Sequence, residues 1–318
     1  MDRDRLQAAL RDRYTIEREL GRGGMSTVFL ARDVVHERPV AIKVLRDELA
    51  AALGAERFQR EIEIAGRLAH PGIVSLSDCG HIGESLYYVM PYVQGETLRA
   101  RLDRERQMSI ADAVSLTCEI ADALDHAHGH GVIHRDIKPE NILLRGARAF
   151  LADFGVARAV VLSADGEAIT ATGVTVGTPG YMSPEQASAD REVDGRSDQY
   201  ALACVLYEML SGEPPFRGPN PQAVIAQHAL APVPSLHTIR PEVPEGVERA
   251  MMRALEKAPE ERYPTAADFA RALHGEYVTA EMAAARRSRI VRFARSNRGL
   301  VVTAVVVVAA GVAWALLH

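Results

Sequence analysis

The chain has 318 residues, with 42 acidic and 37 basic side chains and a formal net charge of −5. This length exceeds that of a usual single domain, and the acidic balance gives no global case for nucleic-acid binding. The three cysteines lie far apart without CxxC spacing, so we expect reduced, buried thiols of a cytosolic domain rather than disulfides. They are Cys79, Cys118 and Cys204.

The N-terminal third predicts a short lead-in followed by a β-rich lobe. Residues 1–13 are charged throughout, so we expect an amphipathic helix and no signal peptide. Residues 14–90 predict several strands and one long helix. Helical spacing from about Leu49 to Leu68 places apolar side chains such as Phe58 on one face.

A glycine-rich stretch lies between the first two expected strands. Glycines let the backbone approach phosphate oxygens, because no Cβ stands in the way. Such a loop is a weak signal on its own. Its residues are Gly21, Arg22, Gly23, Gly24, Met25, Ser26, Thr27 and Val28.

Lys43 ends an apolar run at the distance expected for a third strand. An unpaired lysine in a closing site would be costly to desolvate, so Lys43 needs a carboxylate partner. Glu61 and Glu63 on the following helix are both candidates. The alternative interpretation of either residue is a solvated charge on the helix surface.

A second lobe is expected to be mainly helical. An apolar strand over 87–90 leads into a hinge at 91–93, and residues 111–128 have a helical apolar pattern. Histidines alternate at 126, 128 and 130 near the end of that helix. No HExxH-type partner accompanies them, so we interpret them as a polar helix end rather than a metal site.

Four polar groups with different chemical capabilities follow this helix. Asp136 can accept or orient a hydroxyl proton, and Lys138 can neutralise charge on a transferred phosphoryl group. Asn141 and Asp153 can both coordinate Mg²⁺. They lie in the runs His134–Asn141 and Asp153–Gly155, whose order and separation are very improbable by chance.

At these residues the chain resembles the protein-kinase family. The resemblance implies an α+β bilobal fold over residues 14–274, with an N-lobe at 14–90 and a C-lobe at 94–274. It implies ATP and Mg²⁺ as cofactors, with Mn²⁺ as an alternative. Ser26 stands where the family pattern has its third glycine, and this small residue is a mild departure.

The resemblance also assigns roles around the nucleotide. It favours Glu61 over Glu63 as the partner of Lys43, and it makes Met90 the gatekeeper. Val93 would offer backbone groups to adenine. The full implied nucleotide-binding set is Leu20, Gly21, Arg22, Gly23, Gly24, Met25, Ser26, Thr27, Val28, Ala41, Lys43, Met90, Val93 and Leu143.

Residues 153–185 match the activation segment of the family. Its middle is rich in Ala, Gly and Thr, which suits a loop ordered by phosphorylation. Arg135 could hold such a phosphate bidentately. The candidate phosphosites are Thr170, Thr172 and Thr175, although plain loop threonines are the alternative interpretation.

Further positions are implied to support the catalytic loop. Thr178 would bond the catalytic Asp136 and Lys138, and both Thr178 and Lys138 favour Ser/Thr over Tyr specificity. Asp198 would brace the catalytic loop, and Arg262 would pair with Glu185.

The C-terminal region predicts a membrane anchor. Residues 299–317 contain no charged side chain, and 19 helical residues would cover about 28 Å, close to a bilayer core. The basic segment 275–298 would be a juxtamembrane linker on the cytoplasmic side of a single-pass inner-membrane protein. A buried core helix is the alternative for the apolar run, and a lipid- or partner-binding element is the alternative for the arginines.

Together with the anchor, two stretches resemble the bacterial membrane-anchored Ser/Thr kinases, namely Leu20–Ala31 and Met182–Ala187. The resemblance implies transfer of the ATP γ-phosphoryl group to Ser or Thr hydroxyls of proteins. The first target would be a second copy of the chain in trans, and a homodimer is a further expectation. A pseudokinase scaffold and a small-molecule phosphotransferase are the competing hypotheses, and natural tail-anchoring and truncation both stay open.

Overall fold

The structure, a computed structural model, describes residues 2–24, 26–154, 179–188 and 193–296. It does not describe the side chains at 52, 53 and 286–296. Several predicted sites fall outside the described residues. These are Met25, the threonines Thr170, Thr172, Thr175 and Thr178, and the expected membrane span at 299–317.

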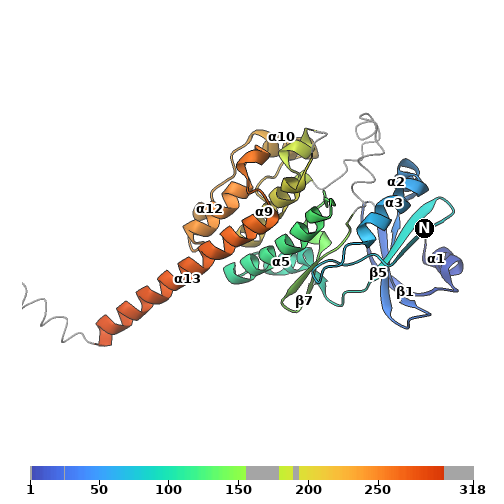
Figure 1. Ribbon diagram of the computed structural model, residues 1–318, viewed down its shortest axis with the longest axis horizontal. Coiled ribbons are helices and arrows are strands. Elements are labelled where there is room, and N and C mark those ends of the chain that lie inside the picture. The colour runs from blue at the N-terminus through green and yellow to red at the C-terminus, as the bar shows by residue number, and fades with distance from the viewer. Residues whose placement is uncertain (1, 25, 155–178, 189–192, 297–318) are drawn as a thin grey trace, which may run out of the picture.

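The N-lobe is an antiparallel five-stranded sheet in the order β1-β2-β3-β5-β4 (Figure 1). Its strands are β1 (Tyr14–Arg22), β2 (Ser26–Asp33), β3 (Pro39–Leu45), β4 (Asp78–Ile82) and β5 (Ser85–Pro91). Helix α1 (Arg3–Leu10) buries Leu6 and Leu10 in one cluster with Tyr14 and Ile16 of β1. The lead-in helix therefore belongs to the packed N-lobe.

The single long helix expected near 49–68 is instead two helices. They are α2 (Asp47–Leu53) and α3 (Ala55–Gly66). Between them Gly54 has φ +72, a left-handed conformation that ends a helix and that glycine adopts without steric cost. Phe58 and Ile62 of α3 are buried in a cluster with β3 and β5.

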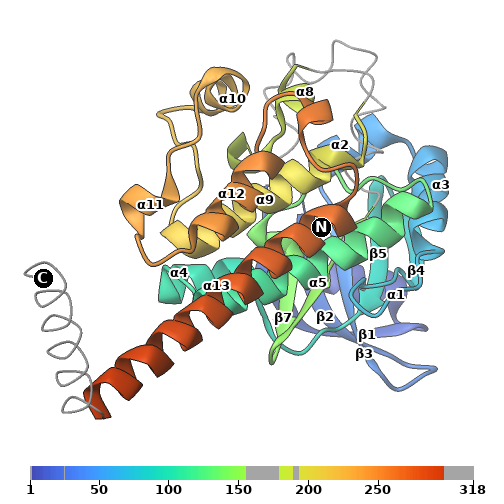
Figure 2. The same ribbon diagram turned by 60° about the vertical axis from the view of Figure 1, so that its left-hand side comes forward.

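The C-lobe is mainly helical, as expected, and is built around α9 (Gly195–Ser211), whose residues 197–210 are all buried. Around α9 pack α5 (Ile110–Gly129), α12 (Glu245–Ala254) and α13 (Ala266–Ser296), as Figure 2 shows. The remaining helices are α4 (Leu98–Glu105), α8 (Pro184–Ala187), α10 (Pro221–Leu230) and α11 (Leu236–Ile239), and the short 3-10 helices are η1 (Pro139–Asn141), η2 (Pro179–Tyr181) and η3 (Pro259–Glu261).

A small sheet of β6 (Glu96–Thr97), β7 (Ile142–Arg145) and β8 (Arg148–Leu151) connects the hinge to the catalytic loop. The chain passes very close to β7 at Gly95, where an added Cβ would stand 1.8 Å from the carbonyl oxygen of Leu144. Only glycine allows this approach, which fixes the hinge against the C-lobe.

Helix α13 runs without a break through the position 274/275 at which the kinase resemblance ends. Its first half packs on α5 and α12, and its second half projects from the C-lobe as a rod (Figure 1). Within the described part of the chain, no helix is sufficiently long and apolar to span a bilayer.

Candidate active site

The catalytic loop is anchored to α9 by one buried carboxylate. Asp198 accepts hydrogen bonds from the backbone N–H groups of His134 (2.8 Å) and Arg135 (2.7 Å). Its Oδ2 is also 2.8 Å from Nε2 of His128 on α5. Arg135 has φ +67, a strained conformation for a non-glycine residue, and the bonds to Asp198 hold it in place. The expected bracing contact of Asp198 is therefore present.

The structure brings three of the predicted catalytic residues into contact. Lys138 Nζ lies 2.7 Å from Asp136 Oδ2. The side-chain amide of Asn141 donates to the backbone oxygen of Asp136 (2.7 Å) and to its carboxylate (3.1 Å). Asp136 is thus oriented from two sides, with a cation within reach of any charge that develops beside it.

Asp153 lies at the junction of the two lobes, with φ +70 and a side chain that is 12% exposed. Its Oδ2 is 2.5 Å from Lys43 Nζ, and its Oδ1 accepts a 2.6 Å hydrogen bond from the hydroxyl of Tyr88. Burial alone would raise the pKa of Asp153. The charge and hydrogen bond of Lys43, with the bond from Tyr88, outweigh burial and lower the pKa.

The expected ion pair between Lys43 and Glu61 is not the one that the structure forms. Lys43 pairs with Asp153, whose left-handed backbone brings its carboxylate to the ammonium group. Glu61 is buried on α3 and is engaged with other groups. Two carboxylates compete for one lysine, and in this conformation Asp153 has it.

Phe154, directly after Asp153, ties the metal-binding segment to the catalytic loop. Its buried ring meets the His134 ring edge-on, with centroids 4.6 Å apart. The ring nitrogen Nε2 of His134 lies 2.8 Å from the carbonyl oxygen of Ala152. Asp136 and Asp153 are therefore held by one buried assembly.

The apolar residues assigned to adenine lie in one cluster that both lobes share. Ala41 and Met90 are buried members, and Leu20, Val28, Val93 and Leu143 pack against it half-buried. In the glycine-rich turn the N–H of Gly23 donates to the oxygen of Ser26 (2.8 Å), and Gly21 pairs with Val28. Arg22 forms an exposed ion pair with Glu19. These contacts shape the β1–β2 turn that carries Gly24 and Thr27.

The donor atoms of this site fit a small, hard cation. Asp153 and Asn141 supply oxygen, which Mg²⁺ and Mn²⁺ prefer. In the described residues, no group of three His, Cys, Asp or Glu side chains could hold a metal by itself. Mg²⁺ usually takes one or two carboxylates together with substrate phosphates. Two protein ligands are consistent with that mode of binding.

The end of the activation segment is fixed to the C-lobe by two buried carboxylates. Glu185 receives Arg262 bidentately, as expected, at 2.7 and 2.8 Å. Glu208 of α9 accepts a 2.5 Å bond from the hydroxyl of Tyr181 and lies 2.8 Å from Arg99. Gln186 donates to the backbone oxygen of Arg135 at 2.9 Å, which links this segment to the catalytic loop.

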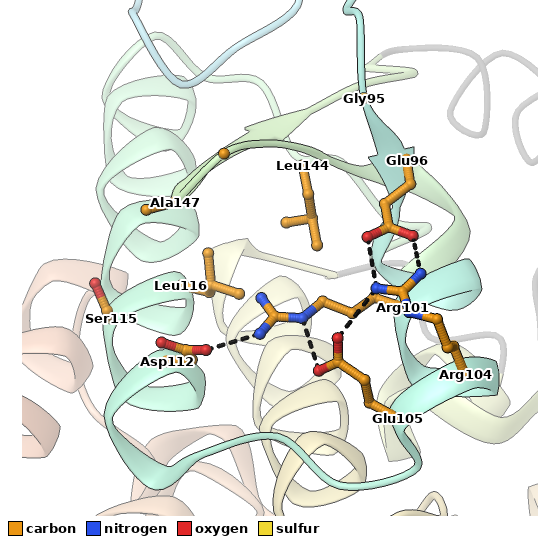
Figure 3. A pocket seen from close by; sticks show the side chains of 11 residues that line it. Gly95, Glu96, Arg101, Arg104, Glu105, Asp112, Ser115, Leu116, Leu144 and Ala147 are labelled. Carbon is orange, nitrogen blue, oxygen red and sulfur yellow. Dashed lines mark hydrogen bonds and ion pairs between the residues drawn. The ribbon is translucent and has the colours of Figure 1, made fainter.

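A hollow of about 650 Å³ lies on another face, between α4, α5 and the β7–β8 turn (Figure 3). Its arginines are already neutralised, because Arg101 bonds Asp112 and Glu105 and Arg104 bonds Glu96. The hollow contains none of the predicted site residues.

Sequence reasoning missed Tyr88, which it treated as part of an apolar strand. The available signal was weak and consisted of a hydroxyl on the strand that precedes the hinge. Its position opposite Lys43 depends on the β3–β5 register, which requires the structure.

A two-lobed fold with a glycine-rich turn, a strand lysine and a catalytic loop beside Asp153 defines a protein kinase domain. Residues 14–277 match the protein kinase domain family, and the chain belongs to that family. The resemblance found in the sequence is confirmed.

Curated relatives are named serine/threonine-protein kinases. The chain is 41% identical over 263 residues to PknH of Mycobacterium bovis, 42% over 271 residues to PknD of Mycobacterium tuberculosis and 44% over 268 residues to PknB of M. tuberculosis. These alignments cover 82–84% of this chain but only 40–43% of the relatives.

Proposed function

We propose that the chain is a serine/threonine protein kinase that transfers the γ-phosphoryl group of ATP to protein hydroxyls. The observation that carries this proposal is the assembly of Asp136, Lys138 and Asn141 beside a buried Asp153. All four groups that a pseudokinase typically lacks in part, including Lys43, are present, so catalysis is favoured over a scaffold.

Each side chain has a defined task in an in-line transfer. Asp136 orients the acceptor hydroxyl and receives its proton as the oxygen–phosphorus bond forms and the bond to the leaving β-phosphate oxygen breaks. Lys138, 2.7 Å from Asp136 Oδ2, offsets charge on the transferred group. A bound Mg²⁺ would neutralise phosphate charge, and Asp153 and Asn141 would hold it. Most of the rate comes from positioning and electrostatics.

Lys43 has to change partners for this reaction. Its ammonium group pairs with Asp153 in the structure, whereas the α- and β-phosphates need a cation when nucleotide is bound. Movement of α3 toward the sheet would offer Glu61 as the new partner. Phosphorylation of Thr170, Thr172 or Thr175 by a second copy of the chain is the event that we propose favours this change.

Mass spectrometry of the purified chain with Mg²⁺ and ATP tests the activity. We expect phosphate on the activation-segment threonines of the unmodified chain and none on Asp136→Asn. Asp122→Asn, which alters an exposed carboxylate on α5, is the matched control and should resemble the unmodified chain. Unmodified chain mixed with Asp136→Asn should phosphorylate the inactive copy if the reaction occurs in trans. Equal phosphate on all variants would contradict the proposal.

We also propose that residues 299–317 anchor the kinase in the cytoplasmic membrane, with the domain on the cytoplasmic side. The support is the uncharged 19-residue run after a cluster of arginines. The full chain should stay in the membrane fraction through an alkaline carbonate wash. A chain that ends at Arg298 should be released, and equal distribution of the two would contradict the anchor.

A further inference from the structure

We propose that Tyr88 is a positioning residue that holds the Asp153 carboxylate in the orientation required by the divalent cation. This inference rests on the proposed metal site and adds a residue that the motifs of the chain do not include.

The strand register places Tyr88 beside the catalytic lysine. Tyr88 of β5 is the direct partner of Lys43 on β3, and residues opposite each other in an antiparallel pair face the same side of the sheet. The Tyr88 hydroxyl lies 2.6 Å from Oδ1 of Asp153, whereas Lys43 lies 2.5 Å from Oδ2. Each carboxylate oxygen therefore has its own donor.

The tyrosine ring is rigidly held. It has no exposed surface, and its centroid lies 6.4 Å from that of Phe58 on α3. The Lys43 ammonium lies 5.9 Å from the ring centroid. A buried phenol needs a hydrogen-bond partner, and Tyr88 has one in Asp153. An aliphatic side chain could supply the packing, so the hydroxyl is the informative part of this residue.

The two donors to Asp153 have different fates during the reaction. Lys43 is needed at the nucleotide phosphates, and its departure frees Oδ2 for the cation. Tyr88 cannot leave, because the core surrounds its ring, so it keeps Oδ1 in place. A carboxylate offers about four lone-pair positions, which accommodate the tyrosine bond and the metal together. Loss of a hydrogen bond to a metal-ligating side chain typically weakens metal affinity or activity about 10–100-fold.

The test is Mn²⁺ binding to the full chain, measured by electron paramagnetic resonance with a non-hydrolysable ATP analogue present. Tyr88→Phe keeps the ring and removes the hydroxyl. We expect its Mn²⁺ affinity to fall at least about 10-fold, with metal-free nucleotide binding and the thermal midpoint close to those of the unmodified chain. Excess Mg²⁺ should restore turnover, which a folding defect would not allow.

Two further variants separate the possible outcomes. Tyr87→Phe changes the neighbouring tyrosine, which packs in the cluster on the other face of β5, and should keep full Mn²⁺ affinity. Asp153→Asn should bind Mn²⁺ weakly. Normal affinity in Tyr88→Phe but not in Asp153→Asn would overturn the role of Tyr88 and leave the metal site intact. Normal affinity in both would overturn the metal site. A Tyr88→Phe defect that excess Mg²⁺ does not rescue would assign the hydroxyl to packing alone.

Discussion

Arg262 lies against Glu185 with its two terminal nitrogens 2.7 and 2.8 Å from the carboxylate oxygens, and the arginine side chain has no exposed surface. The same guanidinium also donates to three backbone oxygens, those of Glu256, Arg196 and Lys257. Burial would raise the pKa of Glu185, but the hydrogen bond and charge of Arg262 outweigh burial and lower it. The pair therefore fixes the end of the activation segment to the C-lobe as a charged unit.

Replacing Arg262 with methionine should destabilise the chain by about 3–5 kcal/mol, because it leaves the Glu185 carboxylate buried without a cation. Urea unfolding of the purified chain measures this change. Arg217→Ala is the control, since its pair with Glu213 is 64% and 56% exposed, and should cost less than about 1 kcal/mol. Equal losses in the two variants would show that the buried pair has no special role.

His128 should stabilise the fold in mild acid. Burial would lower its pKa, but the hydrogen bond and charge of Asp198 raise the pKa above 6.5. The stabilisation is therefore complete below pH 6.5 and is lost as the pH rises through the folded-state pKa. His128→Gln should be less stable than the unmodified chain by about 1–3 kcal/mol near pH 6, and by less in alkali.

Urea unfolding at several pH values gives this difference directly. His130→Gln alters an exposed histidine two residues further on, and its stability difference should vary little with pH. A His128→Gln difference that grows with rising pH would contradict the assigned direction.

The sequence predicted the local parts of the site better than the distant ones. Asp136, Lys138 and Asn141 lie within six residues, so one loop conformation brings them together. The Glu185–Arg262 pair spans 77 positions, and only the family resemblance could predict it. The partner of Lys43 depends on where α3 packs, and the break at Gly54 frees α3 from the preceding helix. Residue patterns do not determine such a choice between two carboxylates.

His228 should make the fold labile in acid, in the opposite direction to His128. It has no exposed surface, and burial together with the nearby charge of Lys257 lowers its pKa to about 4. Its Nδ1 lies 3.0 Å from the Tyr200 hydroxyl, which donates to the neutral ring. The unfolded chain binds this proton near pH 6.5, so stability falls as the pH drops from there to about 4. At ~1.4 kcal/mol per pH unit, the loss reaches about 3 kcal/mol.

The variant His228→Asn retains an acceptor for Tyr200 but has no ring to protonate. It should be less stable than the unmodified chain at neutral pH, because it leaves a cavity. The two proteins should converge as the pH falls toward about 4. Parallel stability curves across that range would contradict a buried neutral histidine at this position.

Glu208 should govern how the chain holds a protein substrate. This buried carboxylate joins Tyr181 at the end of the activation segment to Arg99 on α4. Glu208→Gln removes the charge that both groups share, so η2 should loosen while the nucleotide region keeps its contacts. We expect KM for a protein substrate to rise about 10-fold, the effect of losing about 1.4 kcal/mol from a charged hydrogen bond. KM for ATP should stay within about 2-fold, because nothing in the nucleotide site is altered. Asp103→Asn is the matched control, since Asp103 also bonds Arg99 but is 67% exposed, and it should leave both constants unchanged. A parallel rise in both KM values after Glu208→Gln would instead point to a general loss of structure, which the thermal midpoint of the variant would reveal.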